Sequence, residues 1–155
     1  MTLIAAVLLI NTGCGSAAEP EAGPCTDTPV SADSTALLNF AKIQGLGDLK
    51  DTVGMYYQVI SQGTGAIPTI GSKVFITYMG TLLNGTIFDS TTNAAKTGWP
   101  LGQLVAGWQY GLTKIREGGH IKLLIPSAYG YGCQGSGTIP PNAPIYFDIT
   151  LVSIQ

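Results

Sequence analysis

Short apolar runs separated by glycine-rich turns fill the chain from residue 55 onward. Side chains alternate between the two faces of a predicted strand over residues 73–79, with the period of two that buries one side, and residues 55–60 form a largely apolar stretch of strand length. Residues 121–125 and 145–154 form further apolar runs of strand length. The 21 glycines follow no fixed period, which favours many tight turns over a repeat or a collagen-like chain.

Two local signals complete the predicted fold. Asn84-Gly85 is a preferred pair for a two-residue type I′ turn, so it predicts a hairpin between residues 73–79 and 86–88. Residues 108–115 predict one short helix, which a glycine pair ends. The expected fold is α+β: an antiparallel, five- to six-stranded half-barrel sheet wraps around one short helix and carries an N-terminal extension.

The extension contains a tether and a second helix. Residues 15–29 have too few large apolar side chains to fold alone, which is typical of a tether. Leu37 and Phe40 recur at helical spacing after Ser31 or Asp33, either of which can cap a helix that leans on the domain. The predicted boundaries are a signal peptide and lipobox at 1–14, a tether and short helix at 15–52, and the folded domain at 53–155.

The N-terminus has the pattern of an export signal. Residues 3–10 are apolar but shorter than the roughly 20 residues that span a bilayer, so they suit a signal peptide. Gly13-Cys14 resembles the lipobox of bacterial lipoproteins, whose cysteine is acylated. Lipidation of Cys14 would make the protein a periplasm-facing or outer-membrane lipoprotein of the bacterial cell envelope. Its contact with the membrane would then be through the lipid anchor only.

Two features depart from the lipobox pattern. No Lys or Arg precedes the apolar run, which a start codon assigned too late would explain, and Asn11 stands where leucine is usual. The alternative is an apolar N-terminus with an incidental cysteine.

Composition and charge exclude several classes of function. The chain has 7 Lys and Arg against 9 Asp and Glu, so no basic surface is expected to neutralise nucleic-acid phosphates. One histidine, His120, and 3 scattered cysteines do not make a usual zinc site, and we expect no metal and no cofactor. A nucleophilic pair of Cys133 and His120 is conceivable, but a lone histidine beside a glycine turn favours a surface position. An enzyme of this composition would work through a shaped apolar pocket.

Five segments of the chain carry a family resemblance. In order, residues 74–80, 85–90, 100–108, 125–132 and 139–148 resemble the FKBP-type peptidyl-prolyl cis-trans isomerases. The similarity extends over roughly 100 residues. Each segment alone is a weak signal, but five in the right order are jointly specific.

The resemblance implies an aromatic bowl and assigns its residues. Trp108 would form the floor, and the implied catalytic residues are Tyr78, Asp89 and Tyr131. The other implied substrate-binding residues are Phe88, Trp99, Leu104, Val105, Ile139 and Phe147. Ile139 would offer its backbone N–H to a substrate carbonyl, and the Tyr131 hydroxyl would hold another.

The implied activity is rotation of X–Pro peptide bonds. Such an enzyme assists the folding of exported proteins, takes proline-containing polypeptides as substrates, binds macrolide inhibitors and works as a monomer. Two other classes stay open. One is a chaperone that binds proline-containing segments without appreciable turnover, and the other is an envelope interaction or assembly module.

Two features of the chain depart from the family pattern. No arginine follows Asp89, and Lys96 is the candidate replacement, although lysine lacks the planar guanidinium fork. Thr97 or Gly98 stands where the family often has a pocket phenylalanine, and Trp99 could fill part of that space. These differences bear on catalytic strength and drug affinity more than on the fold.

The cysteines predict one disulfide bond. Once Cys14 is acylated, Cys25 and Cys133 remain in an oxidising compartment. Cys133 lies in the glycine-rich loop beside the expected pocket, and Cys25 lies on a tether long enough to reach it. We therefore expect these two residues to be paired.

Overall fold

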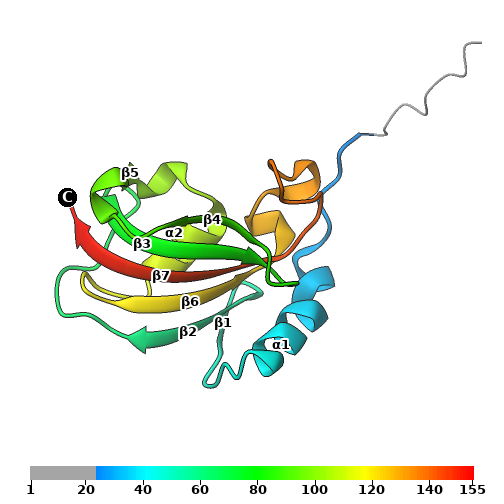
Figure 1. The fold of residues 1–155 in the computed structure, drawn as a ribbon, viewed down its shortest axis with the longest axis horizontal. Helices are drawn as coiled ribbons and strands as arrows, with labels where there is room; N and C mark the ends of the chain where they lie inside the picture. The colour runs from blue at the N-terminus through cyan, green and yellow to red at the C-terminus, as the bar shows by residue number, and fades with distance from the viewer. Residues whose placement is uncertain (1–23) are drawn as a thin grey trace, which may run out of the picture.

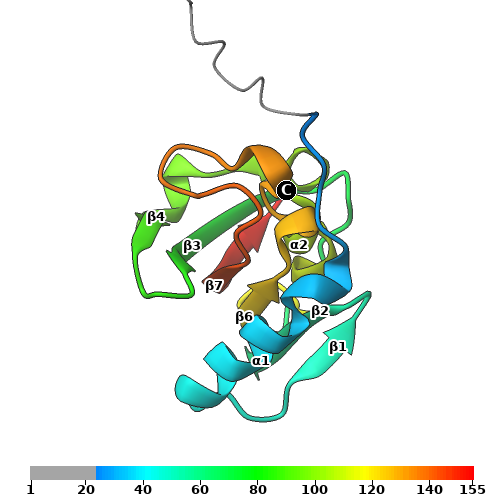
Figure 2. The same cartoon turned by 90° about the vertical axis from the view of Figure 1, so that its right-hand side faces the viewer.

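The computed structural model describes residues 24–155, in which one antiparallel sheet has a helix packed on each face (Figure 1, Figure 2). The predicted signal peptide and Cys14 lie outside the described residues. The first described residues run along the loop that follows β6, and the chain then enters α1 at one end of the sheet.

The sheet has seven strands in the order β1-β2-β6-β7-β3-β4, and the short β5 pairs with β3. Their bounds are β1 (Lys50–Thr52), β2 (Met55–Ser61), β3 (Lys73–Leu82), β4 (Ile87–Thr91), β5 (Trp99–Pro100), β6 (His120–Ile125) and β7 (Ile145–Ile154). Strand β7 is central, because it pairs with β6 on one side and along nearly all of β3 on the other. The last strand in the sequence therefore joins the two halves of the sheet.

The predicted fold class is confirmed, with more strands than expected. The four longer predicted strands are present as β2, β3, β6 and β7. Strands β1 and β5 were not predicted, because segments of three and two residues are too short to show an alternation of polar and apolar positions.

Helix α2 (Ala106–Leu112) begins and ends earlier than the predicted 108–115. Its predicted last turn is instead a tighter turn, in which the Lys114 N–H donates to the Gly111 carbonyl at 3.0 Å. The helix covers the concave face of the sheet, where Trp108 and Leu112 join the main core. Gly107 and Gly111 let α2 approach closely: a Cβ at Gly111 would lie 2.5 Å from Leu123 Cδ1.

Helix α1 (Ser34–Ile43) covers part of the opposite face. It buries Leu37, Phe40 and Ala41 against Leu124 and Tyr146, which confirms the expected helix packed on the domain. The rings of Phe40 and Tyr146 are 5.2 Å apart. Neither α1 nor any other helix within residues 24–155 has the length and apolar content needed to cross a membrane.

Two local predictions were wrong. Asp33 immediately precedes α1, but its side chain does not cap the helix, because both of its hydrogen bonds go to Ser127. The hairpin between β3 and β4 is not a type I′ turn, since Gly85 has a positive φ of 89° and Asn84 does not. The Gly85 N–H donates to the Leu82 carbonyl at 2.9 Å, which is the pattern of a three-residue loop that ends in a left-handed glycine.

The close contact between α2 and β6 generates a test of packing. We expect Gly111→Ala to lower the free energy of unfolding by about 1–2 kcal/mol. A contact this short puts the overpacking cost at the upper end of its usual range, about 2–3 kcal/mol, and alanine returns about 1 kcal/mol of helix propensity. Urea unfolding measures this. Gly71→Ala is the matched control, because no atom lies within 4 Å of its added Cβ. A Gly111→Ala protein as stable as the parent would contradict the close packing.

Candidate functional site

An open cavity of about 390 Å³ lies on the concave face of the sheet, beside the first turn of α2. Its lining comes from five separate stretches of the chain, so only the folded sheet brings it together. The lining residues are Tyr78, Asp89, Trp99, Pro100, Gln103, Leu104, Val105, Trp108, Tyr131 and Phe147. Eight of the ten residues that the resemblance implied are among them, and Phe88 and Ile139 are not.

The Trp108 indole is the centre of an aromatic cluster. Its ring is 4.9 Å from Phe147, 5.1 Å from Tyr78 and 6.4 Å from Trp99, and the first two contacts are edge-to-face. Only 4% of Trp108 is exposed, so the other rings hold it firmly. Its Nε1 is buried and has no hydrogen-bond partner among the described residues.

The loop before α2 forms one side of the cavity. Gln109, on the first turn of the helix, donates from Nε2 to the Leu104 carbonyl at 2.7 Å and so fixes this loop against the helix. Val105 immediately precedes the helix, and its backbone N–H has no acceptor within residues 24–155. Sequence reasoning missed Pro100, Gln103 and this N–H, although all three lie inside the segment that resembles the family.

Tyr78 and Asp89 form the polar part of the site. Strands β3 and β4 pair next to them, and the Tyr78 hydroxyl donates to Asp89 Oδ2 at 2.5 Å. Tyr78 is only 9% exposed, whereas Asp89 lies exposed at the cavity rim. Burial raises the pKa of Tyr78, and the hydrogen bond to Asp89 raises it further, so this hydroxyl stays a donor at neutral pH.

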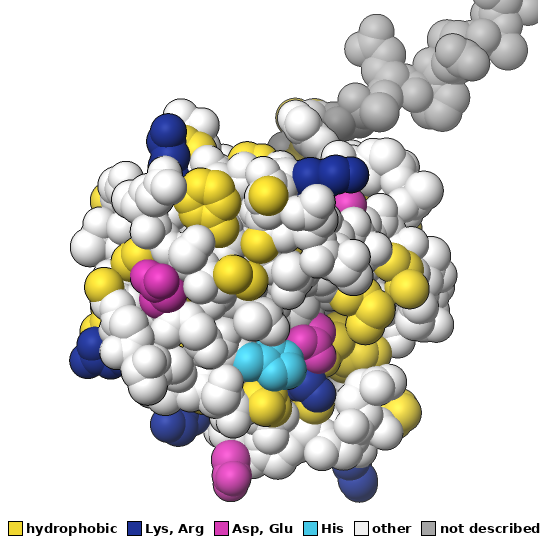
Figure 3. Space-filling view, turned by 60° about the vertical axis from the view of Figure 1, so that its left-hand side comes forward, with side chains coloured by type: hydrophobic (Ala, Val, Ile, Leu, Met, Phe, Trp, Pro, Cys, Tyr) yellow, Lys and Arg dark blue, Asp and Glu magenta, His cyan; other side chains and the backbone are white. Residues whose placement is uncertain are grey.

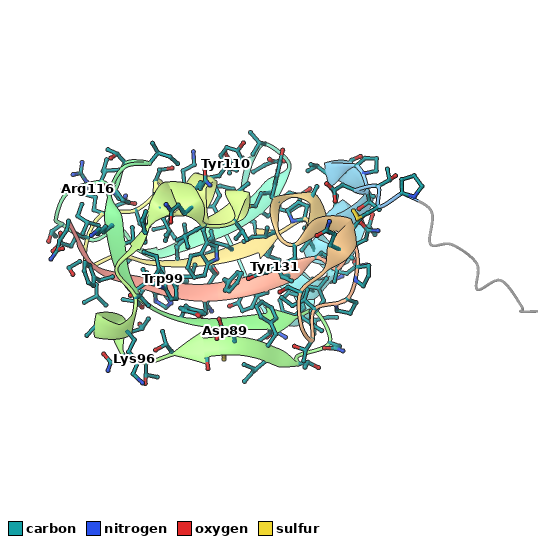
Figure 4. The ribbon with its side chains drawn as sticks, turned by 90° about the horizontal axis from the view of Figure 1, so that it is seen from above. Asp89, Lys96, Trp99, Tyr110, Arg116 and Tyr131 are labelled. Atoms are coloured by element: carbon teal, nitrogen blue, oxygen red, sulfur yellow. A yellow bond between two sulfur atoms is a disulfide. The ribbon has the colours of Figure 1, made fainter. Side chains whose placement is uncertain are left out.

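Within residues 24–155, no cation pairs with Asp89. The ion pairs within residues 24–155 both involve Asp148, and Lys96 is exposed and in neither of them. Figure 4 shows Lys96 apart from Asp89, whereas Trp99 and Tyr131 lie on either side of the cavity. Lys96 therefore does not replace the missing arginine, and Tyr78 is the side chain that holds the carboxylate.

Tyr131 lies on the loop between β6 and β7 and completes the wall. Burial, and then the charge of Asp89, raise the pKa of its hydroxyl. Phe88 stands behind the wall rather than in the cavity, with its ring 6.3 Å from Tyr131 and 5.4 Å from Phe147. Gly80 makes room for this packing, because a Cβ there would lie 2.5 Å from a Phe147 ring carbon.

Ile139 does not have the role that the resemblance implied. Its N–H donates to the Ser136 carbonyl at 2.8 Å, and its side chain is only 6% exposed in the core. The donor is already used within a small turn, so it is not free for a substrate. Val105 supplies the unpaired backbone donor of the cavity wall instead.

His120 and Cys133 do not form a nucleophilic pair. The His120 ring nitrogen lies 2.5 Å from an oxygen of Asp148, and Lys122 Nζ is 3.9 Å from the other oxygen. In Figure 3 the histidine lies at the surface, with an acidic and a basic side chain beside it. Cys133 is joined to Cys25 in a disulfide with Cα atoms 5.6 Å apart, the pairing expected from the cysteine positions.

The sequence and the fold are similar to those of known isomerases. A family model described as FKBP-type peptidyl-prolyl cis-trans isomerase matches residues 65–152. The chain is 39% identical over 110 residues to FK506-binding protein 1 of Dictyostelium discoideum, covering 66% of this chain and 100% of that protein. It is 37% identical over 117 residues to the FKBP-type peptidyl-prolyl cis-trans isomerase FkpA of Escherichia coli, covering 75% of this chain and 43% of that protein.

Structural comparison gives the same result. The crystal structure of FkpA from Escherichia coli superposes with a TM-score of 0.69 and 33% identity, covering 81% of this chain and 61% of that one. A half-barrel with an aromatic cavity beside its short helix, matched in sequence and in structure, defines an isomerase class. The chain belongs to the FKBP-type peptidyl-prolyl cis-trans isomerase family. It spans less than half the length of FkpA.

The raised pKa of Tyr78 predicts how stability changes at alkaline pH. Above its ordinary pKa of about 10, the unfolded chain releases this proton while the folded state still holds it, so stability falls as pH rises. We expect Tyr78→Phe to reduce the decrease in the free energy of unfolding by up to about 1.4 kcal/mol per pH unit. Urea unfolding at a series of pH values above 9 measures the slope. Equal slopes in the parent and the variant would contradict the assignment.

Proposed function

We propose that the cavity accelerates cis–trans isomerisation of X–Pro bonds in exported polypeptides, with the residues of its wall in the roles given below. One observation carries the proposal: packed aromatic rings surround a cavity of about 390 Å³ whose lining includes a single carboxylate, that of Asp89. Such a cavity can hold a proline ring and the peptide bond before it. It offers shape and a few polar groups rather than a nucleophile.

The chemistry needs no covalent step. Rotation about an X–Pro bond is opposed by a barrier of about 18–20 kcal/mol, because the C–N bond has partial double-bond character. Cis and trans differ by only about 0.5–1 kcal/mol, so the catalyst must lower a barrier rather than shift an equilibrium. Twisting the amide breaks its conjugation and reduces its charge separation. A wall of rings such as Trp108 and Phe147 therefore favours the twisted amide over the more polar planar one.

The polar groups at the rim hold the substrate while the bond turns. The Val105 N–H and the Tyr131 hydroxyl are the proposed donors to substrate carbonyls. Asp89 acts on the carbonyl that rotates, and Tyr78 fixes the position of its carboxylate through the 2.5 Å hydrogen bond. Each tenfold gain in rate requires about 1.4 kcal/mol, which a few such contacts can supply.

The proposed ligands follow from the same cavity. Proline-containing segments of unfolded exported proteins are the proposed substrates. The Dictyostelium relative is named for binding FK506, and macrolides of that class are proposed inhibitors here. Because one chain supplies the whole lining, the protein is proposed to work as a monomer.

Asp89 gives the sharpest test of this mechanism. We expect Asp89→Ala to lower kcat/KM about tenfold, because it removes a charge that acts on the rotating carbonyl. Asp89→Asn keeps an acceptor for the Tyr78 hydroxyl and loses only the charge, so it separates the charge from the hydrogen bond. The measurement is the isomerisation rate of a proline tetrapeptide, with thermal melting of each variant.

His120→Ala is the matched control for the Asp89 variants, since it removes a polar side chain that faces away from the cavity. Its activity should equal that of the parent. Loss of activity in folded His120→Ala protein would contradict the mechanism. A parent chain that binds proline peptides without turnover would favour the chaperone alternative.

The membrane attachment of the protein is a separate proposal. We propose that Cys14 is acylated and that the lipid holds the domain at a bacterial envelope membrane. The apolar run that ends at Gly13-Cys14 supports acylation. The similarity to bacterial FkpA and to the Mip isomerase of Coxiella burnetii supports a location in the bacterial envelope.

Metabolic labelling tests the lipid directly. In a bacterial host, a clickable palmitate analogue should label the full chain and should leave Cys14→Ala unlabelled. Cys25→Ala is the control for a cysteine change as such, and it should be labelled like the parent. Equal labelling of the parent and Cys14→Ala would overturn the proposal.

A further inference from the structure

The segment from Cys25 to Asp33 lies along the loop that carries Tyr131. Figure 1 and Figure 2 both show this N-terminal segment beside the loop between β6 and β7. The two are far apart in sequence, and side chains of the segment contact the loop on both sides of Tyr131. The family model begins at residue 65, so it does not include this contact.

Asp33 holds the loop on the N-terminal side of Tyr131. Its Oδ2 accepts the backbone N–H of Ser127 at 2.7 Å and the Ser127 hydroxyl at 2.6 Å. Asp33 is 9% exposed and Ser127 is fully buried, so water does not compete strongly for these bonds. Thr28 Oγ1 adds a third contact, 2.9 Å from Ser127 Oγ. An aspartate placed where helix caps usually stand is thus used to hold the loop instead.

On the C-terminal side of Tyr131, the loop is held at Cys133. The disulfide joins it to Cys25, and Asp27 Oδ1 accepts the Cys133 N–H at 2.7 Å. The segment lies so close that a Cβ at Gly132, which has a positive φ of 56°, would collide with the Asp27 carboxylate. The fixed points, Ser127 and Cys133, are six residues apart, and Tyr131 lies between them.

We propose that residues 25–33 clamp this loop and thereby place Tyr131 in the wall of the cavity. Asp33 is the main positioning residue. The loop needs such a clamp because it contains four glycines between residues 130 and 137, and glycine loses the most conformational freedom on ordering. The inference rests on the proposed function for its kinetic consequence, and the clamp itself can be measured without it.

Hydrogen exchange on the full 155-residue chain tests the clamp directly. Asp33→Ala should speed exchange about tenfold or more at the amides of residues 127–135, because the bonds that hold Ser127 are lost. Asp33→Asn keeps an oxygen that accepts both bonds, so it should restore protection. Phe40→Leu is the control, since it weakens the packing of α1 against Tyr146 without touching the loop. Unchanged exchange in this loop in Asp33→Ala would overturn the proposal.

Kinetics test whether the clamp acts through Tyr131. Asp33→Ala should lower kcat/KM for a proline tetrapeptide about three- to tenfold, and Asp33→Asn should recover most of it. In a Tyr131→Ala background, Asp33→Ala should cause little further loss. An equal further loss, or an equal loss in Phe40→Leu, would show an effect of general stability and contradict the proposal.

Two outcomes call for a second measurement: a variant that does not fold, and a parent chain without isomerase activity. If Asp33→Ala does not fold, Asp27→Ala replaces it, because Asp27 is exposed and its side chain holds only the Cys133 N–H. It should speed exchange at the Cys133 amide, and no change there would count against the clamp. If the parent chain has no isomerase activity, the proposed function fails, while hydrogen exchange still decides on the clamp.

Discussion

The packing of Trp108 between Tyr78 and Phe147 is the contact on which the site depends. It requires that α2 lie close to the sheet, and Gly107 and Gly111 permit this because larger side chains there would meet Ile125 and Leu123. The indole then fills the middle of the concave face, and the remaining rings are arranged around it. Activity and stability therefore share one set of contacts, so changes to the floor of the cavity affect both.

Much of this arrangement could be predicted from the sequence, since long strands leave a clear pattern. The alternation around Phe75 and the apolar run at residues 145–154 each predicted a strand. The aromatic lining followed from the family resemblance, because the segments that carry the resemblance contain most of the aromatic residues that line the cavity. What could not be predicted was which polar group bonds to which. Ile139 was expected to offer its N–H to a substrate, and Asp33 was one of two residues expected to cap α1. In the structure the Ile139 N–H donates to Ser136, and the Asp33 carboxylate accepts from Ser127.

The surroundings of Asp89 show how the site differs from the pattern that the resemblance implied. Without an arginine beside it, the carboxylate lies exposed at the rim and has one neutral donor, Tyr78. A phenol hydrogen bond leaves the full negative charge in place, whereas a guanidinium would neutralise it. The electrostatic field at the cavity mouth is therefore that of an uncompensated carboxylate.

The central place of β7 also governs how the chain can fold. Strands β6 and β3 flank β7 and do not pair with each other, so no sheet of this order forms until residues 145–154 are available. The pairing of β3 with β7 also joins segments about seventy residues apart, and contacts of such long range form slowly. A nascent chain consequently cannot complete this sheet before residues 145–154 have been synthesised. An unfolded chain of this kind is the form that can be threaded through a narrow translocation channel.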